Sequence, residues 1–296
     1  MKLSILLSAI VIGLAAGSLY AMVAVGYTVV YNATRVFNLA QGQLVMMSIM
    51  LSYFVLSVEK WPLIVAIAVC VAASGLAGVI EERLIVRPLL RFGHAHIGWL
   101  IATLAFSIII ETVAADVYGY NPPKPIPSPL VSHVVSLGPI TLSFQYLLVM
   151  ATLVLIVVLV EAFYGRTWTG QAMRATAEDR EAAALFGIDP ARLGMAAFAI
   201  GGVVAGVAGF VIAPIVFSTV TIGLTYSLEG FLAMAIGGFG SLRGAVVGAL
   251  LLGVVTELWD IYIGSSVDLA AGLCLLIVVL AVRPVGIFGR LRERTV

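Results

Sequence analysis

Long apolar stretches recur along the whole chain and constrain its fold more than any other feature. A helix needs about 20 mostly apolar residues to cross the hydrocarbon layer of a membrane. Eight stretches of the chain are long enough for this. A further apolar stretch, at 227–239, is too short to cross fully, so it predicts a half-helix or a tilted, broken span. The sequence therefore predicts an all-α polytopic membrane helix bundle of about eight full spans and one short span. The eight longer stretches lie at 3–31, 36–57, 61–82, 97–118, 142–164, 193–217, 245–263 and 267–282.

The composition supports a membrane protein. Hydrophobic residues make up 62% of the chain and charged residues only 10%, against roughly 25% charged residues in an average soluble domain. The first apolar run continues to Tyr31, far beyond the roughly 7–15 residues of a signal-peptide core, so we expect it to be a retained spanning helix. The net charge of +1 gives no indication of nucleic-acid binding.

The positions of the positive residues predict how the chain is oriented. Positive residues near helix ends remain on the cytoplasmic side of a membrane. A topology with an external N-terminus and a cytoplasmic C-terminus leaves only three positive residues outside, namely Lys2, Lys60 and Lys124. The thirteen arginines are then inside, at positions 35, 83, 87, 91, 166, 174, 180, 192, 243, 283, 290, 292 and 294.

A weak internal repeat appears at an offset of 188 residues. Gly13 then aligns with Gly201, and Gln41-Gly42 aligns with Glu229-Gly230. The predicted topology makes the two units enter the membrane from opposite sides, as in inverted-repeat transporters. Within a single domain of residues 1–296, the units would lie near 1–118 and 193–296; the alternative is a chance alignment of glycine-rich helices.

Polar residues crowd around the start of the second span. Polar groups at membrane depth are costly and usually face a cavity, and unwound backbone is tolerated only where protein or water covers it. The crowding therefore predicts a broken helix that lines a path through the membrane, with Glu229 in the short span as a counterpart. The predicted path residues are Asn38, Gln41, Gly42, Gln43 and Glu229.

The motifs of the common enzyme classes are missing from the sequence. No lysine stands in a phosphate-binding P-loop, and the chain has neither a His-Glu-x-x-His zinc motif nor a Gly-x-Ser-x-Gly nucleophile elbow. We therefore expect no catalytic residues, no metal site and no cofactor. The chain itself is expected to catalyse no reaction.

The segment 165–192 is the most informative polar stretch. Asp179 can cap a short helix over 181–186, which Gly187 would end. A small capped helix on the cytoplasmic face, with apolar Leu185 and Phe186 beside charged Arg180, suits docking into the groove of a partner. The alternative is an amphipathic segment lying on the membrane surface.

An ordered set of motifs resembles the permease subunits of branched-chain amino-acid ABC importers, of the LivH/LivM type and closer to LivH. Glu181-Ala-Ala followed after three residues by Gly187 resembles the coupling motif of bacterial ABC-importer permeases, although its later Ile-x-Leu-Pro part is missing. The further motifs are Gly26-Tyr-Thr-Val-Val-Tyr31, Val36-Phe-Asn-Leu-Ala-Gln-Gly42, Glu82-Arg83 with Arg87-Pro88-Leu89, Ala175-Thr-Ala-Glu-Asp179 with Ala184-Leu-Phe-Gly-Ile188, Ala205-Gly-Val-Ala-Gly209, Gly237-Gly-Phe-Gly-Ser241 and Arg283-Pro-Val-Gly-Ile-Phe-Gly289.

The resemblance implies a multi-pass protein of the bacterial inner membrane with defined partners. These are a second homologous permease, two cytoplasmic ATPase subunits and a periplasmic solute-binding protein. The resemblance also makes 165–192 the segment that couples to the ATPases. Its expected contact residues are Glu181, Ala182, Ala183, Leu185, Phe186 and Gly187.

Departures from the family pattern leave the solute open. Where the family commonly reads Asn-Phe-Ala-His-Gly-Glu, this chain has Asn38-Leu-Ala-Gln-Gly-Gln43, and Glu229 stands where a basic residue is common. Such changes alter the field in a site of low dielectric constant. The expected solutes are branched-chain or other small hydrophobic amino acids, or a related small organic solute. The alternative function is a stand-alone secondary transporter or channel for a small polar solute.

Overall fold

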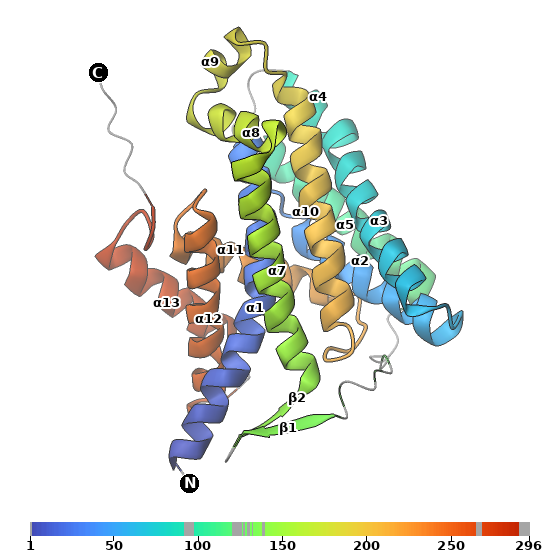
Figure 1. Cartoon of the computed structure of the whole chain (residues 1–296), viewed down its shortest axis with the longest axis vertical. Helices are drawn as coiled ribbons and strands as arrows, with labels where there is room; N and C mark the ends of the chain where they lie inside the picture. Colours follow the sequence, from blue (N-terminus) through green and yellow to red (C-terminus); the bar gives the residue numbers. More distant parts are fainter. Residues whose placement is uncertain are drawn as a thin grey trace.

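The computed structural model describes residues 2–91, 98–119, 126, 128, 131, 133–137, 140–264 and 268–289, and it is a helical bundle (Figure 1). Within these residues, seven helices are long and apolar enough to cross a membrane. They are α1 (Lys2–Thr34), α2 (Gln41–Tyr53) with the π-helix Phe54–Val58, α3 (Leu63–Glu81) with the π-helix Glu82–Val86 and α4 (Arg87–Arg91), α5 (Gly98–Tyr118), α7 (Phe144–Arg166), α10 (Pro190–Ile212) and α12 (Leu242–Tyr262). The predicted polytopic bundle is confirmed.

Two further apolar helices are shorter than a full span. The predicted short span is one continuous helix, α11 (Ile222–Gly237), which begins five residues earlier than expected and has no internal break. The stretch 267–282 was expected to cross fully, but its helix α13 (Asp268–Val282) has only 15 residues. At about 1.5 Å per residue such a helix covers roughly 22 Å, less than the hydrocarbon layer.

The start of the second span differs from the prediction. The apolar residues from 36 onward suggested a helix, yet α2 begins at Gln41. Arg35 ends α1 with a positive φ of 59°, and the Asn38 side chain accepts a hydrogen bond from the Ala40 backbone N–H at 2.9 Å. This local turn competes with the helix, so the chain is non-helical between α1 and α2, as the polar residues there predicted.

Helices from the first part of the chain pack against helices from the last part in an exchanged pattern, in which the first helix of each part lies along the third helix of the other. Helix α1 lies along α12, where a Cβ atom on Gly13 would come within 2.7 Å of the Cα of Val254. Helix α10 lies along α3, where a Cβ atom on Gly206 would come within 2.8 Å of the Cα of Val71. Glycine therefore allows the backbones at both contacts to approach closely.

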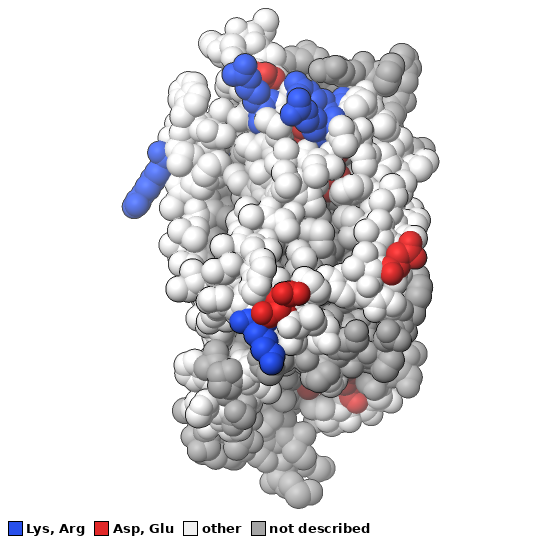
Figure 2. Space-filling view, turned by 90° about the vertical axis from the view of Figure 1, so that its right-hand side faces the viewer, with Lys and Arg blue, Asp and Glu red and all other residues white. Residues whose placement is uncertain are grey.

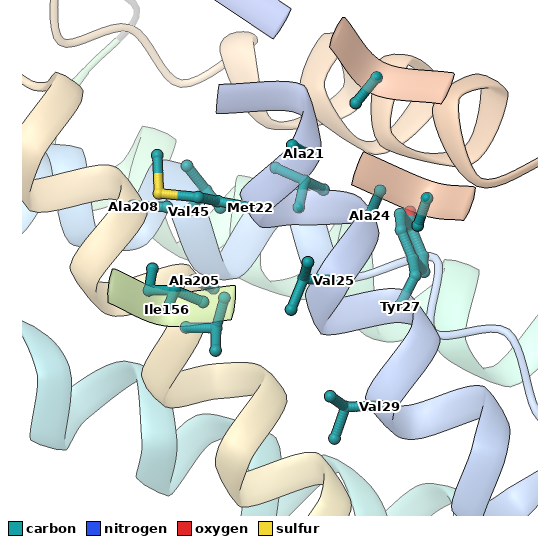
Figure 3. Close-up of a cluster of buried hydrophobic side chains, with 14 of the residues drawn as sticks. Ala21, Met22, Ala24, Val25, Tyr27, Val29, Val45, Ile156, Ala205 and Ala208 are labelled. Carbon is teal, nitrogen blue, oxygen red and sulfur yellow. The ribbon is translucent and has the colours of Figure 1, made fainter. Parts of the chain in front are cut away.

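Helix α1 forms the centre of the bundle. Ala21, Met22 and Val25 are completely buried, and they pack among side chains from α2, α7 and α10 (Figure 3). Between residues 21 and 30 every residue of α1 is buried, and such a segment must be mostly apolar around its whole circumference.

Positive side chains gather at one end of the bundle. Figure 2 shows most of the Lys and Arg side chains of that face at the upper end, where α4 and α8 (Trp168–Glu178) lie in Figure 1. The opposite end holds the N-terminus and a hairpin of β1 (Val134–Leu137) and β2 (Ile140–Ser143), in which Val134 pairs with Ser143. On this face, the described positive side chains therefore lie mainly at the end of α4 and α8.

Candidate functional site

Of the predicted path residues, Gly42 lies where α2 crosses α11, and the other four contact different helices. The Gly42 backbone N–H donates a hydrogen bond to Ser227 Oγ at 3.1 Å, and the Ser227 hydroxyl donates to the Leu39 carbonyl at 3.0 Å. A side chain on Gly42 would overlap the Gly223 carbonyl oxygen and the backbone of Ser227. The two helices therefore touch backbone to backbone at Gly42.

Gln41 fills a slot between α1 and α10. Its side-chain amide donates to the Gly201 carbonyl at 2.9 Å, and a side chain on Gly26 would overlap that amide. Gln41 is completely buried. Within this chain, Gln41 joins three helices of the core rather than facing an open surface.

Gln43 points to the other side of α2, toward α5. Its Nε2 atom donates to Glu111 Oε2 at 3.1 Å, and its amide lies against Gly223 of α11. Gln43 is completely buried and Glu111 is half-buried. An acid inside a spanning helix usually faces a cavity or a polar partner, and Glu111 has Gln43 as its partner.

Asn38 holds the non-helical segment against α3. Its Nδ2 atom donates to Glu81 Oε2 at 2.8 Å, and both side chains are buried. The sequence prediction included Asn38 but not Glu81. Glu229, the fifth predicted residue, is also buried, and its Oε2 atom lies on the α13 side of α11, where a Cβ atom on Gly272 would be 3.9 Å away.

An aromatic cluster lies at the end of the bundle where α1 stops. Phe37 stacks on Tyr31 with 4.8 Å between the ring centroids, and it contacts Phe239 at 5.2 Å. The Trp99 and Phe231 rings each lie 5.8 Å from Phe37. The cluster therefore joins the non-helical segment to α5, to α11 and to the loop that follows α11.

The predicted capped helix is present in the segment 165–192. Helix α9 (Arg180–Leu185) begins after Asp179, whose carboxylate accepts from the Ala182 backbone N–H at 3.0 Å, and Gly187 follows it with a φ of +81°. Leu185 is 89% exposed and Phe186 is 86% exposed. Two large apolar side chains are thus presented outward on the end that carries the positive residues.

The other predicted coupling residues have different surroundings. Ala183 is buried and Ala182 is half-buried, so both face the body of the protein. The side chain of Glu181 lies outside the described part of the chain.

Arg35 links helix α8 to the break before α2. Its guanidinium donates a hydrogen bond to the Ala177 carbonyl in the last turn of α8 and lies 5.3 Å from the centroid of the Tyr31 ring. A cation at a helix C-terminus is stabilised by the unpaired carbonyls there. A displacement of α8 would therefore be transmitted to Arg35, the residue at which the non-helical segment starts.

In the part of the chain that the structure describes, no three His, Cys, Asp or Glu side chains are grouped in a way that could hold a metal ion. The polar side chains around the start of α2 are amides, hydroxyls and carboxylates. They suit hydrogen bonding to a small polar solute or to one another.

Comparison with known proteins assigns the family. The sequence profile of the family described as "Branched-chain amino acid transport system / permease component" matches residues 9–282. The chain belongs to this permease family. This permease is 31% identical over 96% of its length to the high-affinity branched-chain amino acid transport system permease protein BraD of Pseudomonas aeruginosa, of which 96% is covered.

Two other relatives extend the likeness. The permease is 30% identical to LivH of Escherichia coli K12, with 94% of each chain covered, and 26% identical to a probable LivH of Methanocaldococcus jannaschii, with 92% of this chain and 89% of the relative covered. Among solved structures, PsaBC from Streptococcus pneumoniae in complex with a Fab aligns with 94% of this permease and 87% of that chain, at 15% identity and a TM-score of 0.41. That structural likeness is too distant to support an argument.

Proposed function

We propose that this permease imports branched-chain amino acids, or closely related small amino acids, as the membrane subunit of an ABC importer. Its partners would be a second homologous permease, two cytoplasmic ATPases and a periplasmic binding protein. The observation that carries the proposal is full-length similarity to permeases named for branched-chain amino acid transport. The hydroxyl of Ser227 beside Gly42 and the amide–carboxylate pair Gln43–Glu111 between α2 and α5 suit a polar solute.

The proposed orientation places the N-terminus in the periplasm and the C-terminus in the cytoplasm. The gathering of positive side chains at the end of α4 and α8 supports it, because that end is then cytoplasmic. The exposed α8–α9 segment then lies where an ATPase can reach it.

The segment 165–192 is proposed to couple ATP hydrolysis to transport. Leu185 and Phe186 suit an apolar groove of the ATPase, with Glu181 and Gly187 setting the charge and the shape of the contact. Movement of the ATPases would pass through α8 as a rigid-body displacement and reach the break before α2 through Arg35.

The chain is also proposed to contain two inverted repeat units within one domain. The exchanged packing supports this arrangement, because the first helix of each unit lies along the third helix of the other, as α1 lies along α12 and α10 along α3. In addition, Ser227 binds the carbonyl of Leu39, the residue 188 positions earlier, so equivalent positions of the two units meet at the crossing.

Reconstitution tests the proposed function. In proteoliposomes that contain this permease with its partner permease, ATPases and leucine-loaded binding protein, we expect ATP-dependent uptake of labelled L-leucine. The permease alone should show none, because its sequence has no P-loop and ATP hydrolysis is proposed for the separate ATPase subunits. Uptake by the single purified chain, driven by an ion gradient, would instead support the secondary-transporter alternative and contradict the proposal.

The hydrogen bond between Arg35 and the end of α8 gives a second prediction. Arg35→Gln should lower leucine uptake about threefold to tenfold in the reconstituted complex, because a charge-assisted hydrogen bond to α8 is lost. ATP hydrolysis by the complex should change much less. Lys60→Gln is the matched control, since Lys60 also has a positive φ but lies in the break between α2 and α3. Equal losses in both variants would contradict the link.

A further inference from the structure

Glu111 is an acidic residue deep inside a membrane-spanning helix. It lies in α5, thirteen residues after Gly98 and seven before Tyr118. At about 1.5 Å per residue, these separations place it about 20 Å and 10 Å from the two helix ends, which is within the hydrocarbon layer. A carboxylate at that depth is costly and generally serves a function.

Gln43 holds this carboxylate in place. Gln43 is completely buried, and its Nε2 atom donates to Glu111 Oε2 at 3.1 Å. The Gln43 side chain cannot move toward α11, because Gly223 lies directly against it. One carboxylate oxygen is thus fixed from the protein side, while Glu111 itself is half-buried and therefore reachable from the surface of the chain.

A buried apolar cluster joins α5 to α2 on the C-terminal side of Glu111. Ala114 and Ala115 follow it within about one turn of α5 and form a buried cluster with Met46 and Met50 of α2. Methionine side chains are flexible and adapt to differently shaped apolar groups. Met46 is completely buried and Met50 is 4% exposed, so the cluster contacts a passing molecule only when these flexible side chains move. A carboxylate beside such a cluster is complementary to a molecule that carries an ammonium group on an aliphatic skeleton.

We propose that Glu111, positioned by Gln43, binds the ammonium group of the amino-acid solute as it passes through the membrane. The inference rests on the proposed function and specifies the chemistry of one site on the path. The carboxylate would accept hydrogen bonds from the ammonium group, as charge-assisted pairs do. The apolar cluster would contact the aliphatic side chain.

Leucine uptake by the reconstituted complex tests the site. Glu111→Gln should lower the uptake of labelled L-leucine about tenfold, whereas Glu111→Asp should keep it within about threefold of wild type. ATP hydrolysis stimulated by leucine-loaded binding protein should stay within about twofold, because delivery of the solute precedes its passage. A role in folding alone would lower both activities together.

Two further variants sharpen the test. Asp116→Asn removes a more exposed acid from the same helix and should leave uptake within about twofold of wild type. Gln43→Leu should lower uptake about threefold on its own and cause no additional loss when combined with Glu111→Gln, because Gln43 acts through Glu111. Additive losses would contradict the positioning role.

Two results would overturn the inference. One is a Glu111→Gln complex that takes up leucine at the wild-type rate while the wild-type complex transports normally. The other is poor assembly of Glu111→Gln with the second permease, with unchanged uptake per assembled complex, which would make Glu111 an interface residue. If the proposed function itself is wrong, the wild-type complex will show no ATP-dependent uptake. That result would overturn both the proposed function and the inference about Glu111.

Discussion

Gly187→Pro should insert into the membrane and assemble with its partners but lose at least about tenfold of its leucine uptake. Gly187 has a φ of +81°, whereas proline fixes φ near −65°, so the turn after α9 must change direction. The Gly187 N–H also donates to the Ala184 carbonyl at 3.0 Å, and proline has no N–H to donate. The exposed Leu185 and Phe186 would then be presented at a different angle.

The measurement compares ATP hydrolysis with uptake in the same vesicles. Gly187→Asn is the matched control, because asparagine adopts positive φ values more readily than other non-glycine residues, and it should keep most of the coupling. Glu181→Lys reverses a charge at the proposed contact and should act in the same direction as Gly187→Pro. Normal coupling in both Gly187→Pro and Glu181→Lys would contradict the assignment of this segment.

Gly42→Leu should prevent the bundle from forming its native core. A Cβ atom at this position would overlap the Gly223 carbonyl oxygen and the Ser227 backbone, and backbone atoms cannot move aside as a flexible side chain can. Overpacking a core usually costs about 1–3 kcal/mol, and we expect a loss at or above the top of that range. The hydrogen bond from Gly42 to Ser227 would be broken as well.

Thermal unfolding in detergent, followed by size-exclusion chromatography, measures this effect. Gly165→Leu provides the control, because a Cβ atom at Gly165 has nothing within 4 Å. It should retain a monodisperse peak and a wild-type unfolding temperature. A Gly42→Leu protein that unfolds at the same temperature as Gly165→Leu would show that α2 and α11 do not cross as described.

Local signals explain why some features were predictable from the sequence. The cap at Asp179 and the turn at Gly187 depend on residues within a few positions of each other, so their pattern predicted α9 to within one residue. The apolar stretches likewise predicted most of the spanning helices. The start of α2 was missed because hydropathy responds to Val36 and Phe37, whereas the hydrogen bond from Ala40 to Asn38 determines where the helix begins.

Contacts between distant parts of the chain were not predictable in the same way. The sequence did not show that Gly13 would contact α12 or that Gly206 would contact α3. The pairs Asn38–Glu81 and Gln43–Glu111 join residues 43 and 68 positions apart, and the sequence contains no signal for such partners. Only the tertiary packing of the helices brings the two members of each pair together.

The exchanged packing of α1 on α12 and of α10 on α3 has a consequence for biogenesis. During synthesis, α1 and α3 enter the membrane long before their partners exist, so their glycine faces remain in contact with lipid or with insertion factors. The native core therefore closes only when the last third of the chain has been inserted. We expect a nascent chain that stops after α5 to be degraded quickly, even though each of its helices is apolar enough to stay in the membrane.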